Sequence, residues 1–270
     1  MERLEQIEAL NQILLAEMPE YRPQGEQFPR EEGAQRRLLR SLMNLRPPMP
    51  LDPDFLAAQD ALLSAETAEK GVVDGDALTP TQADNRLVLW QGDITRLRAD
   101  AIVNAANSAL LGCFHPCHGC IDNAIHSAAG LQLRDECFRL MEAQRHPEPN
   151  GRAKLTGGYN LPARHVLHTV GPIVQGRVTQ RDREELASCY RACLELAEER
   201  GLHSVAFCCI STGEFHFPNR EAAQIAVDTV RECLRQKTSI RRVIFNVFKD
   251  LDAEIYRGLL GPDRGAETGP

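Results

Sequence analysis

The chain has 270 residues, of which 43% are apolar and 26% are charged, as is typical of a globular protein large enough to bury a full core. Its formal net charge of −7 lies entirely in residues 1–80, and the remaining residues carry equal numbers of acidic and basic side chains. This balance argues against a protein that grips nucleic acid through many phosphate contacts, so we expect no nucleic-acid partner.

The cellular compartment is indicated by missing targeting signals and by the cysteines. No stretch approaches the roughly 18 apolar residues of a membrane span, and the N-terminal residues lack the basic-then-apolar order of a signal peptide. The nine cysteines are odd in number, and several lie inside apolar segments, such as Cys208 and Cys209, which favours free thiols. We therefore expect a cytoplasmic protein with no membrane partner.

Residues 1–80 are predicted to be helical. Apolar residues recur at helical spacing in three groups: Leu4, Ile7, Leu10 and Leu14, then Leu38, Leu39 and Leu42, then Phe55, Leu56, Leu62 and Leu63. A proline-rich stretch separates the second group from the third, and Asp52 followed by Pro53 is a helix-start signal. We interpret residues 1–80 as an N-terminal helical extension packed on the main domain, with an independent functional domain as the alternative.

From residue 86 onward, predicted strands alternate with predicted helices. The strands are expected over 86–90, 99–107, 165–171, 204–210 and 242–248, and the helices over 121–143, 182–201, 219–236 and 252–260. The glycine pair in Leu155–Pro162 is interpreted as a turn or bulge. This alternation predicts a three-layer α/β domain with a mainly parallel sheet over residues 81–262, and residues 263–270 are expected to be a disordered tail.

Polar segments follow several of the predicted strands, where ligands bind in sheets of this kind. Asp93 can accept a hydrogen bond from an exocyclic amine such as that of adenine, although Gly-Asp is also a common turn. Asn104 and Asn107 can bind ribose hydroxyls or cap the turn. The small residues in Ser211–Phe215 can form a backbone nest for phosphate, without the Gly-Lys-Ser/Thr of a Walker motif.

The stretch Gly112–His126, "GCFHPCHGCIDNAIH", concentrates soft metal ligands in one loop. Thiolates and imidazoles favour zinc over magnesium or calcium. The adjacent Cys117 and His118 cannot easily point at the same ion, so three ligands with one open position is the more natural arrangement, as in catalytic zinc sites. His126 falls on the predicted helix and is interpreted as a packed, hydrogen-bonded histidine.

Three alternatives to this interpretation of the loop remain. Cys117 and Cys120 have the spacing of a redox pair, but such pairs usually begin a helix in a thioredoxin-like setting. A zinc deaminase needs H-x-E before P-C-x-x-C, whereas His146-Pro147-Glu148 comes after it. Fortuitous core cysteines would not be expected to cluster among glycine, histidine and proline. A zinc loop therefore remains the preferred interpretation.

The order of five motifs resembles the macrodomain family of ADP-ribose-binding α/β proteins. The motifs are "GDIT", "AIVNAANSALLG", "IDNAIHSAAG", "TGGYNLPARHVLHTVGP" and "ISTGEFHFP", within residues 85–260. In place of a polyglycine phosphate loop, "GCFHPCHGC" looks like the zinc-containing branch of ADP-ribosyl hydrolases, as does "LLRSLMNLRPP" in the extension. The resemblance implies a three-layer α/β/α fold with a mixed, mainly parallel sheet.

The resemblance also implies roles for individual residues. Cys113, His118 and Cys120 would bind one Zn²⁺ per chain, while Cys117 would be a bystander or a fourth donor. Asp93 and Ile94 would hold the adenine, with Phe248 nearby. Asn107 and Asp122 would face the distal ribose, and Asn104 would be a further ADP-ribose contact. The residues around the diphosphate would be Ile121, Ser211, Thr212, Gly213, Glu214 and Phe215.

The implied activity is hydrolytic removal of mono-ADP-ribose from modified proteins, at C1 of the distal ribose. Asp122 or Asn107 would orient the attacking water, and the zinc would be either catalytic or structural. The alternative is a reader module that binds ADP-ribose without cleaving it. The resemblance also makes a lipoyl-carrier protein, modified by a sirtuin-like transferase, a candidate substrate.

Overall fold

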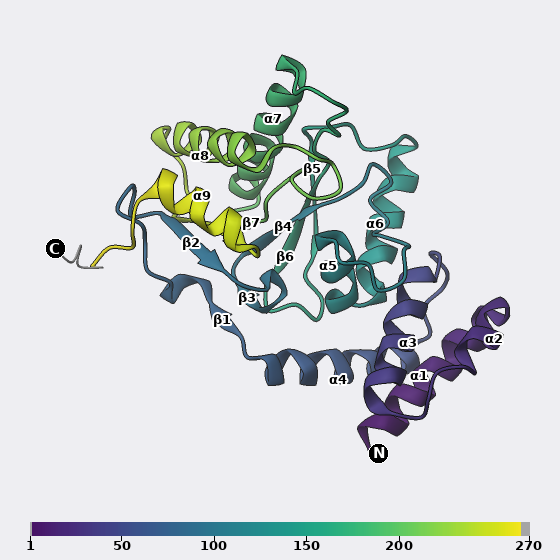
Figure 1. Cartoon of the computed structure of the whole chain (residues 1–270). Coiled ribbons are helices and arrows are strands. Elements are labelled where there is room, and N and C mark those ends of the chain that lie inside the picture. The colour runs from purple at the N-terminus through teal and green to yellow at the C-terminus, as the bar shows by residue number, and fades with distance from the viewer. Residues whose placement is uncertain (1, 266–270) are drawn as a thin grey trace.

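The computed structural model describes residues 2–265 and contains a six-stranded sheet (Figure 1). In spatial order its strands are β2 (Leu87–Gln91), β8 (Arg242–Val247), β7 (Ser204–Phe207), β4 (Ala101–Ala105), β6 (His165–Thr169) and β5 (Ala153–Gly157). All neighbouring strands are parallel except β5, which pairs antiparallel with β6. This confirms the expected mixed, mainly parallel sheet.

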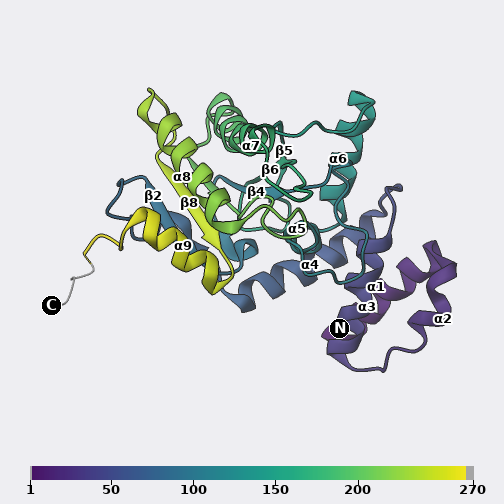
Figure 2. The ribbon, with the colours of Figure 1, turned by 45° about the horizontal axis from the view of Figure 1, so that its top comes forward.

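Helices cover both faces of this sheet, as expected for three layers (Figures 1 and 2). One face carries α7 (Gln180–Glu199), α8 (Asn219–Arg235) and α9 (Asp250–Leu260), which pack consecutively against one another. The other carries α5 (Ile121–Ala129) and α6 (Leu131–Gln144). Because both faces are covered, the central strands are almost fully buried and read as apolar runs rather than alternating ones.

The N-terminal extension is helical, as predicted. It comprises α1 (Arg3–Glu17), η1 (Pro19–Tyr21), α2 (Arg22–Gly25), α3 (Glu32–Leu45) and α4 (Pro53–Lys70). Asp52 caps α4 by accepting hydrogen bonds from the amides of Asp54 and Phe55, both at 2.9 Å. The extension has an apolar core that includes Leu131 of α6, so it packs on the main domain.

A short connection joins the extension to the sheet. It contains β1 (Val73–Asp74) and η2 (Gly75–Ala77), and β1 pairs in parallel with β3 (Leu97–Arg98). Near the other end of the described chain, Asp263 bridges Thr81, so the first residues of the expected tail contact the domain. Residues 266–270 of that tail lie outside the described residues. Within residues 2–265, no helix is long and apolar enough to cross a membrane.

One local prediction was wrong, and one strand was not predicted. The helix expected over 121–143 is interrupted at Gly130, whose φ of 97° favours glycine and where a Cβ would lie 2.6 Å from the side-chain amide of Gln59. The turn expected at the glycine pair is present, because the Leu161 amide donates to the Gly158 carbonyl at 3.0 Å, but strand β5, which ends at Gly157, was not predicted. β5 is half-exposed and only Thr156 in it is buried, so it lacks the apolar signature of a core strand.

Candidate active site

The candidate site is a cavity of about 790 Å³ beyond the carboxyl ends of β2, β8, β7 and β4. These four strands are adjacent and parallel, so the loops that follow them meet at one edge of the sheet. Every predicted site residue except Asn104 lines the cavity: Asp93, Ile94, Asn107, Cys113, His118, Cys120, Ile121, Asp122, Ser211, Thr212, Gly213, Glu214, Phe215 and Phe248.

One end of the cavity is formed by the loops after β2 and β8. Asp93 caps η3 (Ile94–Arg96), because its Oδ1 accepts from the amide and the hydroxyl of Thr95 at 3.0 and 2.7 Å. Phe248 follows β8, is 76% exposed and lines the cavity. This end therefore presents a carboxylate beside an accessible aromatic face.

The loop Ser211–Phe215 forms the floor of the cavity with free backbone donors. In the part of the chain that the structure describes, the amides of Gly213, Glu214 and Phe215 donate no hydrogen bond. Ser211 has a φ of 64°, and its hydroxyl is buried without a partner in the same residues. Converging amides and an unpaired hydroxyl of this kind are suited to an anion.

The deepest acidic group in the cavity is Asp122, in the first turn of α5. Its Oδ1 accepts from Asn104 Nδ2 at 2.7 Å, and its Oδ2 accepts from Asn107 Nδ2 at 3.3 Å. Burial raises the pKa of the Asp122 carboxyl to about 6, opposed by the Asn104 hydrogen bond and by Arg134. The carboxyl is thus held in one orientation and has an unusually high proton affinity.

Asn104 lies behind Asp122 rather than on the cavity surface. It is fully buried, and its Nδ2 also contacts His168 Nδ1 at 3.2 Å. His168 Nε2 in turn contacts Thr156 Oγ1 at 2.9 Å, which anchors the chain of contacts in the sheet. The structure therefore places Asn104 as a support for Asp122, whereas Asn107 reaches the cavity itself.

His126 is packed in the interior, but the expected hydrogen bond is missing. Neither ring nitrogen has a hydrogen-bond partner within residues 2–265, and Nε2 lies 3.5 Å from Asp122 Oδ1. Burial lowers the pKa of His126 well below its usual value, so the ring is neutral at pH 7. The ring lies against Gly112, where a Cβ would approach its carbon Cγ to 2.9 Å.

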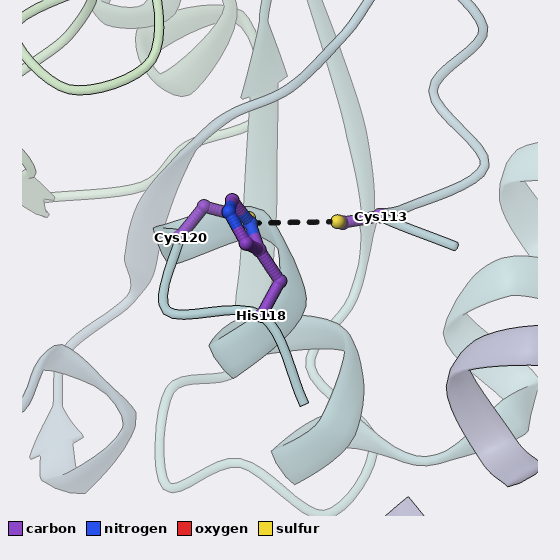
Figure 3. A group of neighbouring side chains, drawn as sticks. All are labelled: Cys113, His118 and Cys120. Atoms are coloured by element: carbon purple, nitrogen blue, oxygen red, sulfur yellow. Dashed lines mark hydrogen bonds between the residues drawn. The ribbon is translucent and has the colours of Figure 1, made fainter. Parts of the chain in front are cut away.

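Cys113, His118 and Cys120 converge on one point (Figure 3). One ligand atom from each lies within 4.8 Å of the others, and Cys113 Sγ is 3.7 Å from His118 Nδ1. Burial raises the pKa of the Cys120 thiol to about 12, so this thiol is not a self-activated nucleophile. Two sulfurs and one imidazole nitrogen on the wall of a cavity fit a three-ligand zinc site with an open position.

Cys117 lies apart from this group. It is exposed, has a φ of 52°, and directs its Sγ toward Ser41 Oγ in α3 at 3.3 Å. The redox alternative pairs Cys117 with Cys120, whose Sγ instead caps α5 by accepting from the Asn123 amide at 3.4 Å. The fold also differs from the thioredoxin-like setting that this alternative needs, so the ligand group is the better interpretation of the loop.

Several residues that line the cavity were not assigned to it by sequence reasoning. Arg40 comes from α3 of the extension, and Asn246 and Lys249 lie at the end of β8 and just after it. Asn246 Nδ2 donates to the Gly92 carbonyl at 2.9 Å and so fixes the loop that carries Asp93. A polar residue near the end of a buried strand was a usable signal for Asn246, whereas the only signal for Arg40 was its place in the stretch "LLRSLMNLRPP".

The fold and site define a macrodomain, and the comparisons agree. Residues 103–226 match the Macro domain family. The chain is 48% identical over 253 residues to a protein of Treponema medium named protein-ADP-ribose hydrolase, covering 93% of this chain and 96% of the relative. The chain therefore belongs to the macrodomain family.

Solved structures give the same result. A Trypanosoma brucei macrodomain in complex with ADP-ribose is 32% identical, with a TM-score of 0.64 and coverage of 82% of this chain and 95% of that chain. A mutant of the Oceanobacillus iheyensis macrodomain with ADPR is 38% identical, with a TM-score of 0.58 and coverage of 64% and 90%. These proteins therefore share the macrodomain fold of this chain.

Proposed function

We propose that this protein is a hydrolase that removes mono-ADP-ribose from modified proteins by cleavage at C1 of the distal ribose. The observation that carries the proposal is the cavity, which combines an anion-binding loop with a buried, pre-oriented carboxyl at Asp122 and three metal ligands. The name of the Treponema medium relative and the ligand of the Trypanosoma brucei structure support the same substrate class.

The cavity offers a matching group for each part of ADP-ribose. Asp93 and Phe248 suit adenine, because a carboxylate can accept from its amine and an exposed ring can stack on it. The free amides of Gly213, Glu214 and Phe215 suit the diphosphate. The first turn of α5, which begins at Ile121, adds unpaired amides and the positive end of a helix dipole.

Asn107 and Asp122 are then left for the distal ribose and the attacking water. Water attacks C1, the bond from C1 to the protein side chain breaks, and a proton passes to the leaving group. Asp122 accepts a hydrogen bond from the water or from a ribose hydroxyl, and Asn104 holds its carboxyl for that task. The rate enhancement would come from holding the ribose and the water in position and from the electric field of fixed hydrogen-bond donors around them.

Cys113, His118 and Cys120 would hold a zinc ion at the edge of this ribose region. When bound, zinc polarises an oxygen ligand or lowers the pKa of a bound water toward about 7. Because Cys120 caps α5, the same ligand set also fixes the helix that carries Asp122. The same three ligands would therefore serve either a structural zinc or a catalytic zinc.

The natural substrate is proposed to be a mono-ADP-ribosylated protein in the cytoplasm. All nine cysteines are free, which supports a reducing compartment. A lipoyl-carrier protein modified by a sirtuin-like transferase is the candidate suggested by the family resemblance. Release of ADP-ribose from such a carrier, compared with an unrelated mono-ADP-ribosylated protein, tests this choice.

The proposed activity is tested by incubating the full chain with a mono-ADP-ribosylated protein and measuring free ADP-ribose, with and without a chelator. Hydrolysis that stops on chelation and returns with Zn²⁺ supports the proposal. Tight binding of ADP-ribose with no release from the protein would instead make this chain a reader module. Equal rates for the wild type and Cys120→Ala would exclude a catalytic zinc.

A further inference from the structure

The loop that carries the candidate metal ligands has little backbone structure of its own. Between residues 113 and 120, the one internal backbone hydrogen bond among the described residues joins the amide of His118 to the carbonyl of His115 at 3.2 Å. Loops with so few internal bonds depend on outside contacts to hold their side chains in place. In this protein many of those contacts come from α3 of the N-terminal extension.

Arg40 of α3 contacts both the loop and the helix that follows it. Its Nη2 donates to the His118 carbonyl at 3.2 Å, and its Nη2 and Nε donate to Asn123 Oδ1 at 2.7 and 3.1 Å. Asn123 Nδ2 then donates to the His115 carbonyl at 2.9 Å. The planar guanidinium therefore bridges the backbone of one metal ligand and the first turn of α5.

Asn44, one helical turn after Arg40, contacts the middle of the loop. Its Oδ1 accepts from the Cys117 amide at 2.9 Å, and its Nδ2 donates to Ser127 Oγ of α5 at 3.0 Å. The Cys117 thiol completes the contact by donating to the Arg37 carbonyl at 3.5 Å. Cys117, which is no ligand in this geometry, thus has a use as an anchor to α3.

A third contact fixes the entry to the loop. Arg134 of α6 donates to the Leu111 carbonyl at 2.7 Å and to the Met43 and Arg46 carbonyls, at the end of α3, at 2.7 Å each. The Arg134 guanidinium also lies 4.4 Å from the centre of the Phe114 ring. The two ends of the loop and its middle are therefore all tied to the same helix.

The burial of these polar groups indicates that the arrangement is specific. Asn44 is 1% exposed and Asn123 is fully buried, and burying amides costs free energy unless they are paired. Helix α3 already covers its own apolar core with Leu38, Leu39 and Leu42. The packing of α3 does not need the polar side chains of Arg40 and Asn44. The hydrogen-bond partners of these two side chains belong to the loop and to α5.

We propose that α3 positions the metal loop, with Arg40 and Asn44 as positioning residues for the ligands Cys113, His118 and Cys120. This inference rests on the proposed zinc site and extends it to the N-terminal helices. Outer contacts that orient ligands typically account for about 10- to 100-fold in metal affinity. The N-terminal extension would then contribute to the active site by holding the metal loop in place, without taking part in the reaction itself.

The test measures zinc affinity of the full chain by competition with a chromogenic chelator, without any turnover. We expect Arg40→Ala and Asn44→Ala to bind zinc about 10- to 100-fold more weakly than the wild type. Arg40→Lys, which keeps the charge but cannot make both contacts, should fall between. Arg36→Ala is the matched control, because Arg36 lies one turn earlier on α3 and pairs with Glu66 instead of the loop.

Thermal midpoints of the metal-free proteins separate positioning from folding. Arg36→Ala breaks a partly buried ion pair, so it should lower the midpoint while zinc affinity stays within about twofold. Where Arg40→Ala yields too little folded protein, Arg40→Lys and Asn44→Ala carry the test. Amides of residues 113–120 should also exchange with deuterium faster in Arg40→Ala than in Arg36→Ala.

Three results would overturn the inference. The positioning role alone is overturned if Arg40→Ala and Asn44→Ala bind zinc as tightly as the wild type. It is also overturned if Arg36→Ala weakens zinc binding as much as those two variants do. Wild-type protein that takes up no zinc overturns the proposed metal site and the positioning role together. The release assay for ADP-ribose is independent of these measurements and reports on the hydrolase proposal.

Discussion

Glu214 Oε1 lies 3.7 Å from His118 Nε2, and this contact joins the loop after β7 to the candidate metal loop. The other ring nitrogen of His118, Nδ1, faces Cys113 Sγ at 3.7 Å. At 3.7 Å the contact is longer than a hydrogen bond, but it places a carboxylate on the far side of the proposed ligand, where such groups orient a metal-binding imidazole. The proposed anion-binding half and the proposed metal-binding half of the cavity are therefore in contact through one histidine.

Replacing Glu214 should weaken zinc binding modestly. Because the Glu214 side chain is largely exposed, we expect Glu214→Ala to lower zinc affinity only about 3- to 10-fold, near the low end for such contacts. Glu214→Gln keeps a hydrogen-bond acceptor and should lie closer to the wild type. Chelator competition measures both, and a loss in Glu214→Gln larger than in Glu214→Ala would contradict the orienting role.

Asp122→Asn should separate binding from hydrolysis. The amide preserves the shape of the carboxyl but cannot accept at both oxygens, so release of ADP-ribose should slow by about 100-fold or more. ADP-ribose affinity, measured by calorimetry, should change by less than about tenfold because the diphosphate and adenine contacts are untouched. A variant that hydrolyses at the wild-type rate would remove Asp122 from the mechanism.

Gly171→Ala should weaken ADP-ribose binding through the anion-binding loop. A Cβ at Gly171 would lie 2.1 Å from Ser211 Oγ, so Ser211 and the amides that follow it must shift. We expect at least a tenfold loss of affinity in calorimetry. Gly258→Ala in α9 is the control, because a Cβ there meets no atom within 4 Å; equal affinities in the two variants would contradict the prediction.

The strand-end loops could be predicted from sequence because their signal is local. Asp93, Asn107 and Ser211 each follow a buried strand, and parallel strands bring such positions together. Asn104 carries the same signal but sits within β4 and points to the interior, a distinction that depends on the side of the strand it occupies. Strand-end position alone could not separate these two asparagines.

Contacts between distant segments could not be predicted in this way. Arg40 reaches His118 across the chain; the stretch around Arg40 resembles the zinc-containing branch, but its sequence does not show which loop Arg40 contacts. The antiparallel edge strand β5 escaped notice because half-exposed strands show no continuous apolar run. The break at Gly130 depends on close packing against Gln59, a residue of the extension.

His168 should make the protein sensitive to acid. Burial lowers the pKa of His168 to about 3, well below its unfolded value near 6.5, so between these values the unfolded state binds the extra proton. The free energy of unfolding therefore falls as pH decreases from about 6.5 toward 3, by about 1.4 kcal/mol per pH unit from this histidine. The groups that face the ring are Asn104, Thr156, Cys137 and His126.

The measurement for this prediction compares urea unfolding of the wild type and His168→Gln between pH 4 and 7. The variant is expected to be less stable at pH 7 but to lose less stability on acidification. The neighbouring His126, whose pKa burial also lowers, is present in both proteins, so the difference in slope reports His168. Parallel pH profiles for the two proteins would contradict the assignment.

The central claim, that water cleaves the bond at C1 of the distal ribose, is tested most directly by hydrolysis in ¹⁸O-labelled water. The substrate is a protein carrying ADP-ribose on a carboxylate side chain, and the products are analysed by mass spectrometry after brief reaction, with free ADP-ribose in the same water as the exchange control. The account predicts one ¹⁸O atom in the released ADP-ribose and none in the protein. Label in the protein carboxylate, or no release at all, would contradict it.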